Sequence, residues 1–293
     1  MADAKGNKPM VKSPLNFTGG KYRLLNQIIP LFPKRINTMI DLFSGGSNVG
    51  ANTKANKIIS IDSQKELIRL FNSFKEHEKE KVFYTIFNII DKYDLSKSFE
   101  YGYKHYNCNS IKGLGKYNKE RFIKLREDYN NLPKDSFYKD IMFYTITIYS
   151  FNNQIRFNSK DECNISVGKR DFNKNLQQNL HNFIDRIKSI DMEFHAMDFR
   201  DLDINQYDKE DLFIYADPPY LITTATYNEK NGWNVYKEKE LLKLLDSIDS
   251  KGIKFALSNV LESNGRKNKI LQQWSNKYKI NYLRKVISWY RLQ

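Results

Sequence analysis

The sequence predicts an α/β fold, a doubly wound and mostly parallel sheet with an inserted, largely helical domain. Two observations carry this prediction. Towards both ends of the chain, short apolar runs alternate with segments of helical periodicity, as in βαβ units. Between residues 100 and 171 that rhythm is absent, and Asn, Tyr and scattered Gly residues are frequent. We therefore predict one domain formed by residues 13–99 and 172–293, interrupted by an insertion at 100–171.

Five short apolar runs predict the strands. The first leads into a glycine-rich turn, and the second ends at Asp62. The run at 211–216 (DLFIYA) is apolar and aromatic, which is typical of a strand buried within a parallel sheet. In chain order the predicted strands are residues 38–43, 57–61, 192–196, 211–216 and 253–257.

Apolar residues at helical spacing predict the helices that connect these strands. The first helix follows a Gly-Gly turn, and two more follow the second strand. In chain order the predicted helices are residues 22–29, 64–74, 79–93, 239–249 and 267–277. The apolar run at 139–151 (KDIMFYTITIYSF) belongs to the insertion, which we expect to have loops of its own.

The charge and the aromatic content favour a polyanion that also presents flat rings. The chain has 48 Lys and Arg against 34 Asp and Glu residues, a formal net charge of +14, and 14% of its residues are aromatic. These properties suit nucleic acid. A genome rich in A and T would also raise the Lys, Asn, Ile and Tyr content, so composition alone leaves both explanations open.

Other function classes have little support in the sequence. Cys108 and Cys163 form neither a disulfide framework nor a zinc-binding pattern, and the four histidines are scattered. No apolar run reaches the length of a membrane span, and the first residues lack the apolar core of a signal peptide. We expect no metal, no membrane and a cytoplasmic location.

The most informative motif is Asp217-Pro218-Pro219-Tyr220, directly after the run at 211–216. The carboxyl ends of strands are where open α/β sheets bind their ligands. An exocyclic amino group could donate hydrogen bonds to Asp217 and to the Pro218 carbonyl, while the Tyr220 ring stacks on a planar base. The alternative is an ordinary Asp-Pro-Pro turn that ends a strand.

A glycine-rich turn follows the first predicted strand. Its residues include Asp41, Ser44, Gly45 and Gly46, and a helix is predicted to open behind them. Glycines let a ligand approach the backbone, and a helix amino terminus offers free N–H groups. Asp62, about twenty residues on, suits the two hydroxyls of a ribose. A turn of this kind is a weak signal by itself, and Asp62 strengthens it.

Near the amino terminus, Phe17-Thr18-Gly19-Gly20-Lys21 precedes a predicted helix. It could supply a flat ring, a close backbone and a cation to the same cofactor. An ordinary Gly-Gly turn is the alternative, and the pattern does not separate the two.

The order of these motifs resembles that of the Dam-type DNA adenine-N6 methyltransferases, over roughly Ser13 to Trp274. The resemblance implies a Rossmann-like sheet, S-adenosyl-L-methionine as the methyl donor and the adenine amino group as the acceptor. It also implies roles by position. The cofactor would be contacted by Phe17, which is often Trp in this family, and by Lys21. It would also be contacted by the glycine-rich turn, at Asp41, Ser44, Gly45 and Gly46. Asp62 would bind the ribose, Asp198 and Phe199 would flank the adenine, and Asp217 would lie between cofactor and target base.

Within the insertion, residues 151–158 (FNNQIRFN) are similar to the target-recognition loop of that family. Arg can bind a guanine edge with two hydrogen bonds, Asn can read adenine, and an aromatic ring can fill the space left by a flipped base. Arg156, Asn152 and Phe151 are the candidates for these roles. We expect Lys169 and Arg170 to contact phosphates. The alternative is a solvent loop.

The expected function is transfer of a methyl group to adenine N6 in a short site on double-stranded DNA, such as GATC, by base flipping. We expect a monomer, and a cognate restriction endonuclease is an open question. One alternative is methylation of RNA or protein. The other is a catalytically weak or silent protein that binds DNA.

The carboxyl-terminal segment departs from the family pattern. Family members usually continue past the equivalents of Trp274 and Tyr282 into a loop and a final strand pair. Here we expect residues 280–289 to form a single closing strand instead. On that expectation turnover is weak and S-adenosylmethionine raises the melting temperature noticeably.

Overall fold

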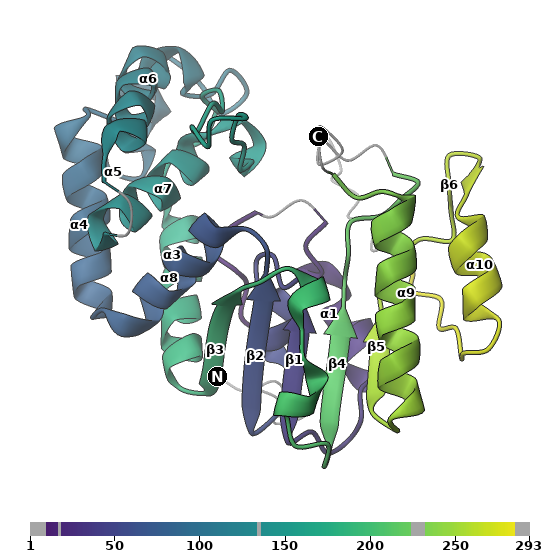
Figure 1. Ribbon diagram of the computed structural model, residues 1–293. Helices are drawn as coiled ribbons and strands as arrows, with labels where there is room; N and C mark the ends of the chain where they lie inside the picture. The colour runs from purple at the N-terminus through teal and green to yellow at the C-terminus, as the bar shows by residue number, and fades with distance from the viewer. Residues whose placement is uncertain (1–9, 17–18, 134–135, 224–231, 285–293) are drawn as a thin grey trace. The chain divides into compact units, whose positions relative to one another are not determined.

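The computed structural model describes residues 10–16, 19–133, 136–223 and 232–284 of the chain (Figure 1). The chain divides into two compact units. The sheet unit comprises Lys21–Ser63 and Asp191–Gln293, and the helical unit comprises Met1–Gly20 and Gln64–Ile190. The segment predicted as an insertion, 100–171, lies within the helical unit, which extends beyond it in both directions. That 100–171 is a separate target-recognition domain stays a prediction.

The sheet unit contains a five-stranded sheet in which all neighbouring strands are parallel, in the order β3-β2-β1-β4-β5. The strands are β1 (Thr38–Leu42), β2 (Lys57–Asp62), β3 (Asp191–Ala196), β4 (Leu212–Ala216) and β5 (Lys254–Leu257). The strand order reverses between β1 and β4, so the sheet is doubly wound as predicted. The carboxyl ends of these two strands form the switch point where such sheets bind ligands.

Both faces of the central strands are buried, which explains why the runs are apolar along their length. On one face, Ile40 of β1 and Ile214 of β4 join a core with Leu241 and Leu245. Those two leucines come from α9 (Val235–Ser250). On the other face, the Phe32 ring packs on Phe213 and Tyr215 of β4, with centroids 4.7 and 5.4 Å apart.

Several short elements complete the sheet unit. Lys21 precedes the helical turns of the amino-terminal segment, and the glycine-rich turn after β1 opens a short helix. A two-stranded antiparallel hairpin and a further helix follow β5. These elements are η1 (Tyr22–Leu24), α1 (Leu25–Ile28), η2 (Ile29–Leu31), α2 (Asn48–Asn52), η4 (Phe199–Asp201), η5 (Ile204–Gln206), β6 (Glu262–Ser263), β7 (Arg266–Lys267) and α10 (Lys269–Ser275).

The helical unit is organised around α7 (Phe137–Tyr149), in which every residue from Lys139 to Tyr149 is buried. The α7 helix contacts α3, α4 and α6. Its charged Asp140 is satisfied by Ser73 and Arg69, whose donor atoms lie 2.8 and 3.2 Å from the carboxylate oxygens. The other elements are α3 (Lys65–Glu76), α4 (Lys79–Lys92), α5 (Ser98–His105), α6 (Gly115–Asn131), η3 (Phe151–Asn153) and α8 (Lys174–Lys188).

The carboxyl-terminal expectations need correction where the structure describes the chain. The predicted helix at 267–277 begins at Lys269, because residues 266–267 form β7, and the β6–β7 hairpin is absent from the sequence prediction. Residues 280–284 form no strand, and the remainder of the predicted closing strand lies outside the described residues. Among the described residues, no helix is long and apolar enough to cross a membrane, and no group of His, Cys, Asp and Glu could hold a metal.

Candidate functional site

Asp217 stands at the carboxyl end of β4, at the switch point of the sheet. Its backbone N–H donates to the carbonyl of Leu42, with 3.3 Å between the atoms, so the residue is tied to the end of β1. Its Oδ2 accepts a hydrogen bond from Lys21 Nζ at 2.5 Å, and its Oδ1 accepts one from the Tyr220 hydroxyl at 3.2 Å. Lys21 Nζ also lies 5.2 Å from the centre of the Tyr220 ring. The predicted motif and the predicted cation therefore form one cluster.

The charge of Asp217 depends on its two partners. Burial raises the pKa of the Asp217 carboxyl, whereas Lys21 and the Tyr220 hydroxyl lower it. The Lys21 side chain is only 8% exposed, so this ion pair is poorly screened by water. The pKa of Asp217 is raised overall, while the donors at its two oxygens suit a carboxylate that accepts hydrogen bonds.

Asp41 is buried inside the turn rather than presented to a ligand. Its Oδ2 accepts the Gly50 N–H at 2.9 Å, which fixes α2 against β1. A Cβ at Gly50 would lie 2.9 Å from this oxygen, so the close approach requires glycine. Burial, helped by the neighbouring carboxylates of Asp217 and Asp62, raises the pKa of Asp41 to about 7. Three carboxyl groups and the Lys21 ammonium thus share one electrostatic environment.

The glycine-rich turn joins β1 to the end of β2. The Gly45 N–H donates to Asp62 Oδ2 at 2.9 Å, and the Ser44 N–H donates to the Ile61 carbonyl at 2.9 Å. Gly45 has φ of 48°, which glycine adopts without strain. Gly46 is buried in the same turn. Asp62 and the turn therefore lie at the same edge of the sheet, as predicted for a nucleoside site.

Two buried polar atoms at the carboxyl edge of the sheet have no hydrogen-bond partner within the described part of the chain. They are Ser44 Oγ in the turn after β1 and Asn259 Nδ2 after β5. Buried polar groups are rarely left without a partner, so each such atom requires an explanation. A polar ligand bound at this edge would supply the missing hydrogen-bond partners.

Phe199 contributes to an aromatic cluster beside the turn. Its ring centre lies 5.2 Å from that of Phe43 and 5.6 Å from that of Trp233, and it is 5% exposed. Asp198 instead points its carboxylate at Arg200, which donates two side-chain hydrogen bonds of 2.8 Å. This interaction lowers the pKa of the Asp198 carboxyl. Both residues lie near the turn, and their contact with a cofactor stays a prediction.

Three residues of the cluster carry no role in the sequence prediction. Phe43 and Trp233 hold the Phe199 ring, and Glu238 accepts a hydrogen bond from Trp233 Nε1 at 2.5 Å. Glu238 is fully buried in the first turn of α9. The one feature of the sequence that could have pointed to these three residues is the tryptophan shortly after the Asp-Pro-Pro-Tyr motif. No spacing rule distinguishes it from other tryptophans.

In the helical unit, residues 150–168 form a long loop with two antiparallel bridges, Ser150↔Val167 and Phe157↔Cys163. The α6 helix anchors it, because Asn130 exchanges two hydrogen bonds with the backbone of Cys163, of 2.8 and 3.1 Å. Gly168 packs so tightly that a Cβ would lie 2.2 Å from the Ser150 carbonyl oxygen. The loop is therefore held by specific contacts.

The predicted recognition residues are exposed on this loop or directly after it. Phe151 is 49% exposed, and Asn152, Arg156, Lys169 and Arg170 are also exposed. Asn152 adopts a left-handed conformation with φ of 54°, in the short helical turn that starts at Phe151. The side chains are accessible to a partner of the helical unit, and their roles stay predictions.

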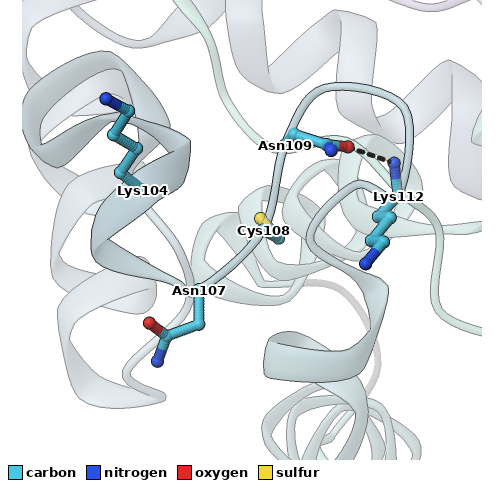
Figure 2. Close-up of a pocket in the computed structure, with 5 residues that line it drawn as sticks. All are labelled: Lys104, Asn107, Cys108, Asn109 and Lys112. Carbon is cyan, nitrogen blue, oxygen red and sulfur yellow. Dashed lines mark hydrogen bonds between the residues drawn. The ribbon is translucent and has the colours of Figure 1, made fainter.

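A second surface feature of the helical unit is a hollow of about 260 Å³ at the end of α5 and along the segment that follows it (Figure 2). It is lined by Lys104, Asn107, Cys108, Asn109 and Lys112. Asn109 Oδ1 accepts the Lys112 N–H at 2.9 Å, so this amide closes the local turn, and the two lysine side chains point in different directions (Figure 2). No predicted site residue lines the hollow.

The structure thus brings together Lys21, Asp41, Asp62, Asp217 and Tyr220, with Ser44, Gly45 and Gly46 in the adjoining turn. Pro218 and Pro219 continue the chain between Asp217 and Tyr220. Phe17, the predicted ring of the amino-terminal motif, lies outside the described residues.

Comparison with known proteins identifies relatives over most of the chain. The profile of the D12 class N6 adenine-specific DNA methyltransferases matches residues 17–288. The type II methyltransferase M.FokI of Planomicrobium okeanokoites is 41% identical over 279 residues, which cover 93% of this chain and 39% of that protein. The modification methylase StsI of Streptococcus sanguinis is 39% identical over 284 residues, covering 94% of this chain and 40% of that protein.

A more distant relative is similar in length. The DNA adenine methylase of Haemophilus influenzae is 26% identical over 259 residues, which cover 86% of this chain and 81% of that protein. By contrast, this chain spans about two fifths of the length of M.FokI and StsI.

Proposed function

The chain belongs to the D12 class N6 adenine-specific DNA methyltransferase family, and from that membership we propose that it methylates the N6 amino group of adenine in double-stranded DNA. The observation that carries the proposal is the cluster at the end of β4. There a partly buried carboxylate, a lysine and a tyrosine converge beside a glycine-rich turn. M.FokI and StsI are named as a methyltransferase and a modification methylase, and the relative from Haemophilus influenzae as a DNA adenine methylase.

The proposed methyl donor is S-adenosyl-L-methionine, and the residues present fit it. Asp62 and Asp217, with Asp41 ionised only in part near pH 7, outnumber Lys21 among the described groups of this cluster, so a cationic ligand gains favourable electrostatic energy at this edge. The Ser44 hydroxyl is a buried polar atom without a partner among the described residues. Asp62 would hold the ribose hydroxyls, and the turn at Gly45 and Gly46 would allow close approach. When bound, the donor supplies an activated methyl group on a sulfonium.

The role of Asp217 follows from its geometry. An aromatic amine is too weak an acid to lose a proton first, so Asp217 acts as a hydrogen-bond acceptor that orients the amine and its lone pair. The Tyr220 ring offers a flat surface for the base. Positioning of this kind can lower a barrier by several kcal/mol, about 7–11 kcal/mol for well-oriented intramolecular reactions.

The proposed substrate is a short duplex site read by the helical unit. Three exposed residues have suitable chemistry. The Phe151 ring could fill the space that a flipped base leaves in the stack, Asn152 could hydrogen-bond to adenine, and Arg156 could bind a guanine edge. Lys169 and Arg170 would contact phosphates. A palindrome such as GATC is one such site, and a monomer could methylate its two strands in separate events. Because two relatives are modification enzymes, a cognate restriction endonuclease is a reasonable partner to seek.

The test is methyl transfer from labelled S-adenosylmethionine to a panel of duplexes, with RNA and protein as competitors. We expect label on adenine N6 of duplex DNA only. Asp217→Ala should reduce turnover at least about a hundredfold, the usual scale for loss of a positioned acid–base or hydrogen-bonding group. The cofactor should still raise the melting temperature of that variant. Normal turnover by Asp217→Ala, or a wild-type protein that binds DNA without methylating it, would reject the proposal.

A further inference from the structure

The hairpin after β5 is an element without a role in the site. Strands β6 and β7 pair through Glu262↔Lys267 and Ser263↔Arg266. The turn residues Asn264 and Gly265 have φ of 49° and 76°. An Asn-Gly pair with both φ values positive is the preferred two-residue turn for a tightly twisted hairpin. The hairpin therefore has a defined shape despite its short strands.

The exposed surface of this hairpin is basic. Arg266, Lys267 and Lys269 are all exposed, and the first two lie on one strand while the third opens α10. The acidic residue of the hairpin is Glu262, whose carboxylate lies 3.8 Å from Lys267 Nζ. Three positive groups against one negative group leave a net positive surface.

A buried polar network fixes the base of the hairpin. Asn268, 1% exposed, donates from Nδ2 to Glu238 Oε1 at 2.8 Å, and Trp233 donates to the other oxygen of Glu238. The Asn268 N–H donates to the Leu261 carbonyl at 3.0 Å, which closes the strand pair. Burial of a carboxylate is costly unless it is fully hydrogen-bonded, so this network holds one geometry.

The hairpin follows the strand beside the catalytic one. Ala216 of β4 pairs in register with Leu257 of β5, so Asp217 and Ser258 leave the sheet at the same edge. Four residues, 258–261, then connect β5 to β6. Because an extended chain spans at most about 3.6 Å per residue, β6 begins within about 18 Å of the end of β5. That upper limit corresponds to about five base pairs of duplex, at 3.4 Å per phosphate along one strand.

We propose that the β6–β7 hairpin, through Arg266 and Lys269, binds backbone phosphates of the duplex that flanks the target adenine. The inference rests on the proposed function, since it assigns a further part of the same substrate to the sheet unit. Basic side chains on a fixed hairpin at the edge where the base must enter would position the duplex without reading its sequence. Lys267 contributes less because it is paired with Glu262.

The test measures binding of a duplex carrying one target site as a function of salt. The variant is Arg266→Ala/Lys269→Ala. Its matched control is Lys54→Ala/Lys209→Ala, which removes the same charge from exposed positions that precede β2 and β4 and so lie at the opposite edge of the sheet. The hairpin variant should bind about tenfold or more weakly, and the slope of log affinity against log salt should fall by about 2. The control should keep the wild-type slope.

A duplex series locates the contact. Trimming the flank on one side of the adenine should weaken wild-type binding to the level of the hairpin variant, and the variant should be insensitive to that trimming. Equal slopes for variant and control overturn the inference while methylation of DNA by the wild type keeps the proposed function. A hairpin variant that methylates altered sequences also overturns it, since phosphate contacts do not select bases. A wild type that binds no duplex DNA rejects both.

Discussion

Lys21 donates a hydrogen bond to Asp217 although 196 positions separate them in the chain. Lys21 belongs to the segment before the first helical turn and Asp217 ends β4, so the contact exists only because the amino-terminal segment packs at the switch point of the sheet. It joins a residue predicted to bind the cofactor to the one predicted to orient the target amine. Lys21, together with the Tyr220 hydroxyl, therefore lowers the pKa of the group on which the proposed chemistry depends.

Replacement of Lys21 should shift the pH dependence of methylation. Lys21→Met removes the cation that lowers the pKa of Asp217, while burial, which raises that pKa, remains. A larger fraction of Asp217 is then protonated at a given pH, so the acid limb of the kcat/KM profile should move to higher pH. Lys21→Arg keeps a cation and should move the limb less. An unchanged acid limb in Lys21→Met would contradict this role.

Asp41 should make the protein less stable as the pH rises from about 4 to about 7. Its pKa is raised from 3.8 to about 7 by burial. In that window the unfolded chain has released the proton that the folded chain still binds, so the free energy of unfolding falls by at most about 1.4 kcal/mol per pH unit from this group. Asp41→Asn removes this titrating group. The free energy of unfolding of the variant, compared with that of the wild type, should therefore increase as the pH rises from about 4 to about 7. The measurement is urea denaturation of both proteins at several pH values. If the free energy of unfolding changes with pH by the same amount in both, the prediction is wrong.

Asp62 should contribute to cofactor affinity beyond its support of the turn. Asp62→Ala removes the acceptor for the Gly45 N–H, at a cost of about 1 kcal/mol. Asp62→Asn keeps an acceptor there but lacks the carboxylate. We expect both variants to bind S-adenosylmethionine at least about tenfold more weakly in calorimetry, a loss of about 1.4 kcal/mol. Only the alanine variant should be less stable without ligand. If Asp62→Asn binds S-adenosylmethionine as tightly as the wild type does, the Asp62 carboxylate does not bind the ribose.

Arg156 and Lys169 should differ in their effects on DNA binding. Arg156→Ala should lose about 1–3 kcal/mol of discrimination at one base pair, because a pair of hydrogen bonds to a guanine edge is lost. Lys169→Ala should weaken binding to all sequences alike. Competition with single-base variants of the methylated site measures both. If both substitutions act uniformly, Arg156 does not read sequence.

Gly168→Ala should disturb the loop at residues 150–168 without removing a predicted recognition side chain. The new Cβ would lie 2.2 Å from the Ser150 carbonyl oxygen, so the backbone must shift. Overpacking of this kind typically costs about 1–3 kcal/mol. We expect a lower melting temperature and weaker DNA binding, with binding of S-adenosylmethionine retained. A variant as stable as wild type with full DNA affinity would show that the loop accommodates the change.

The parallel sheet was predictable because its signals are local. Strands buried on both faces are apolar along their length, and all five predicted runs match observed strands within one residue at each end. The helix predicted at 239–249 starts earlier, at Val235, where the Asn234 side chain accepts the Lys237 N–H at 3.0 Å. Val235 and Tyr236 are exposed, so apolar periodicity did not reveal that first turn. The β6–β7 hairpin was missed because its strands are short and polar, although the Asn264-Gly265 pair was visible.

The sequence by itself determined which residue types stand at the ends of which strands. Asp217 follows β4 and Asp62 ends β2, and each position is read from turn chemistry over a few residues. The tertiary structure decided which of these groups meet. It paired Lys21 with Asp217, buried Asp41 against Gly50 and joined Glu238 to Asn268. Periodicity and turn preferences act over a few residues, whereas these contacts depend on strand order and packing between segments far apart in the chain.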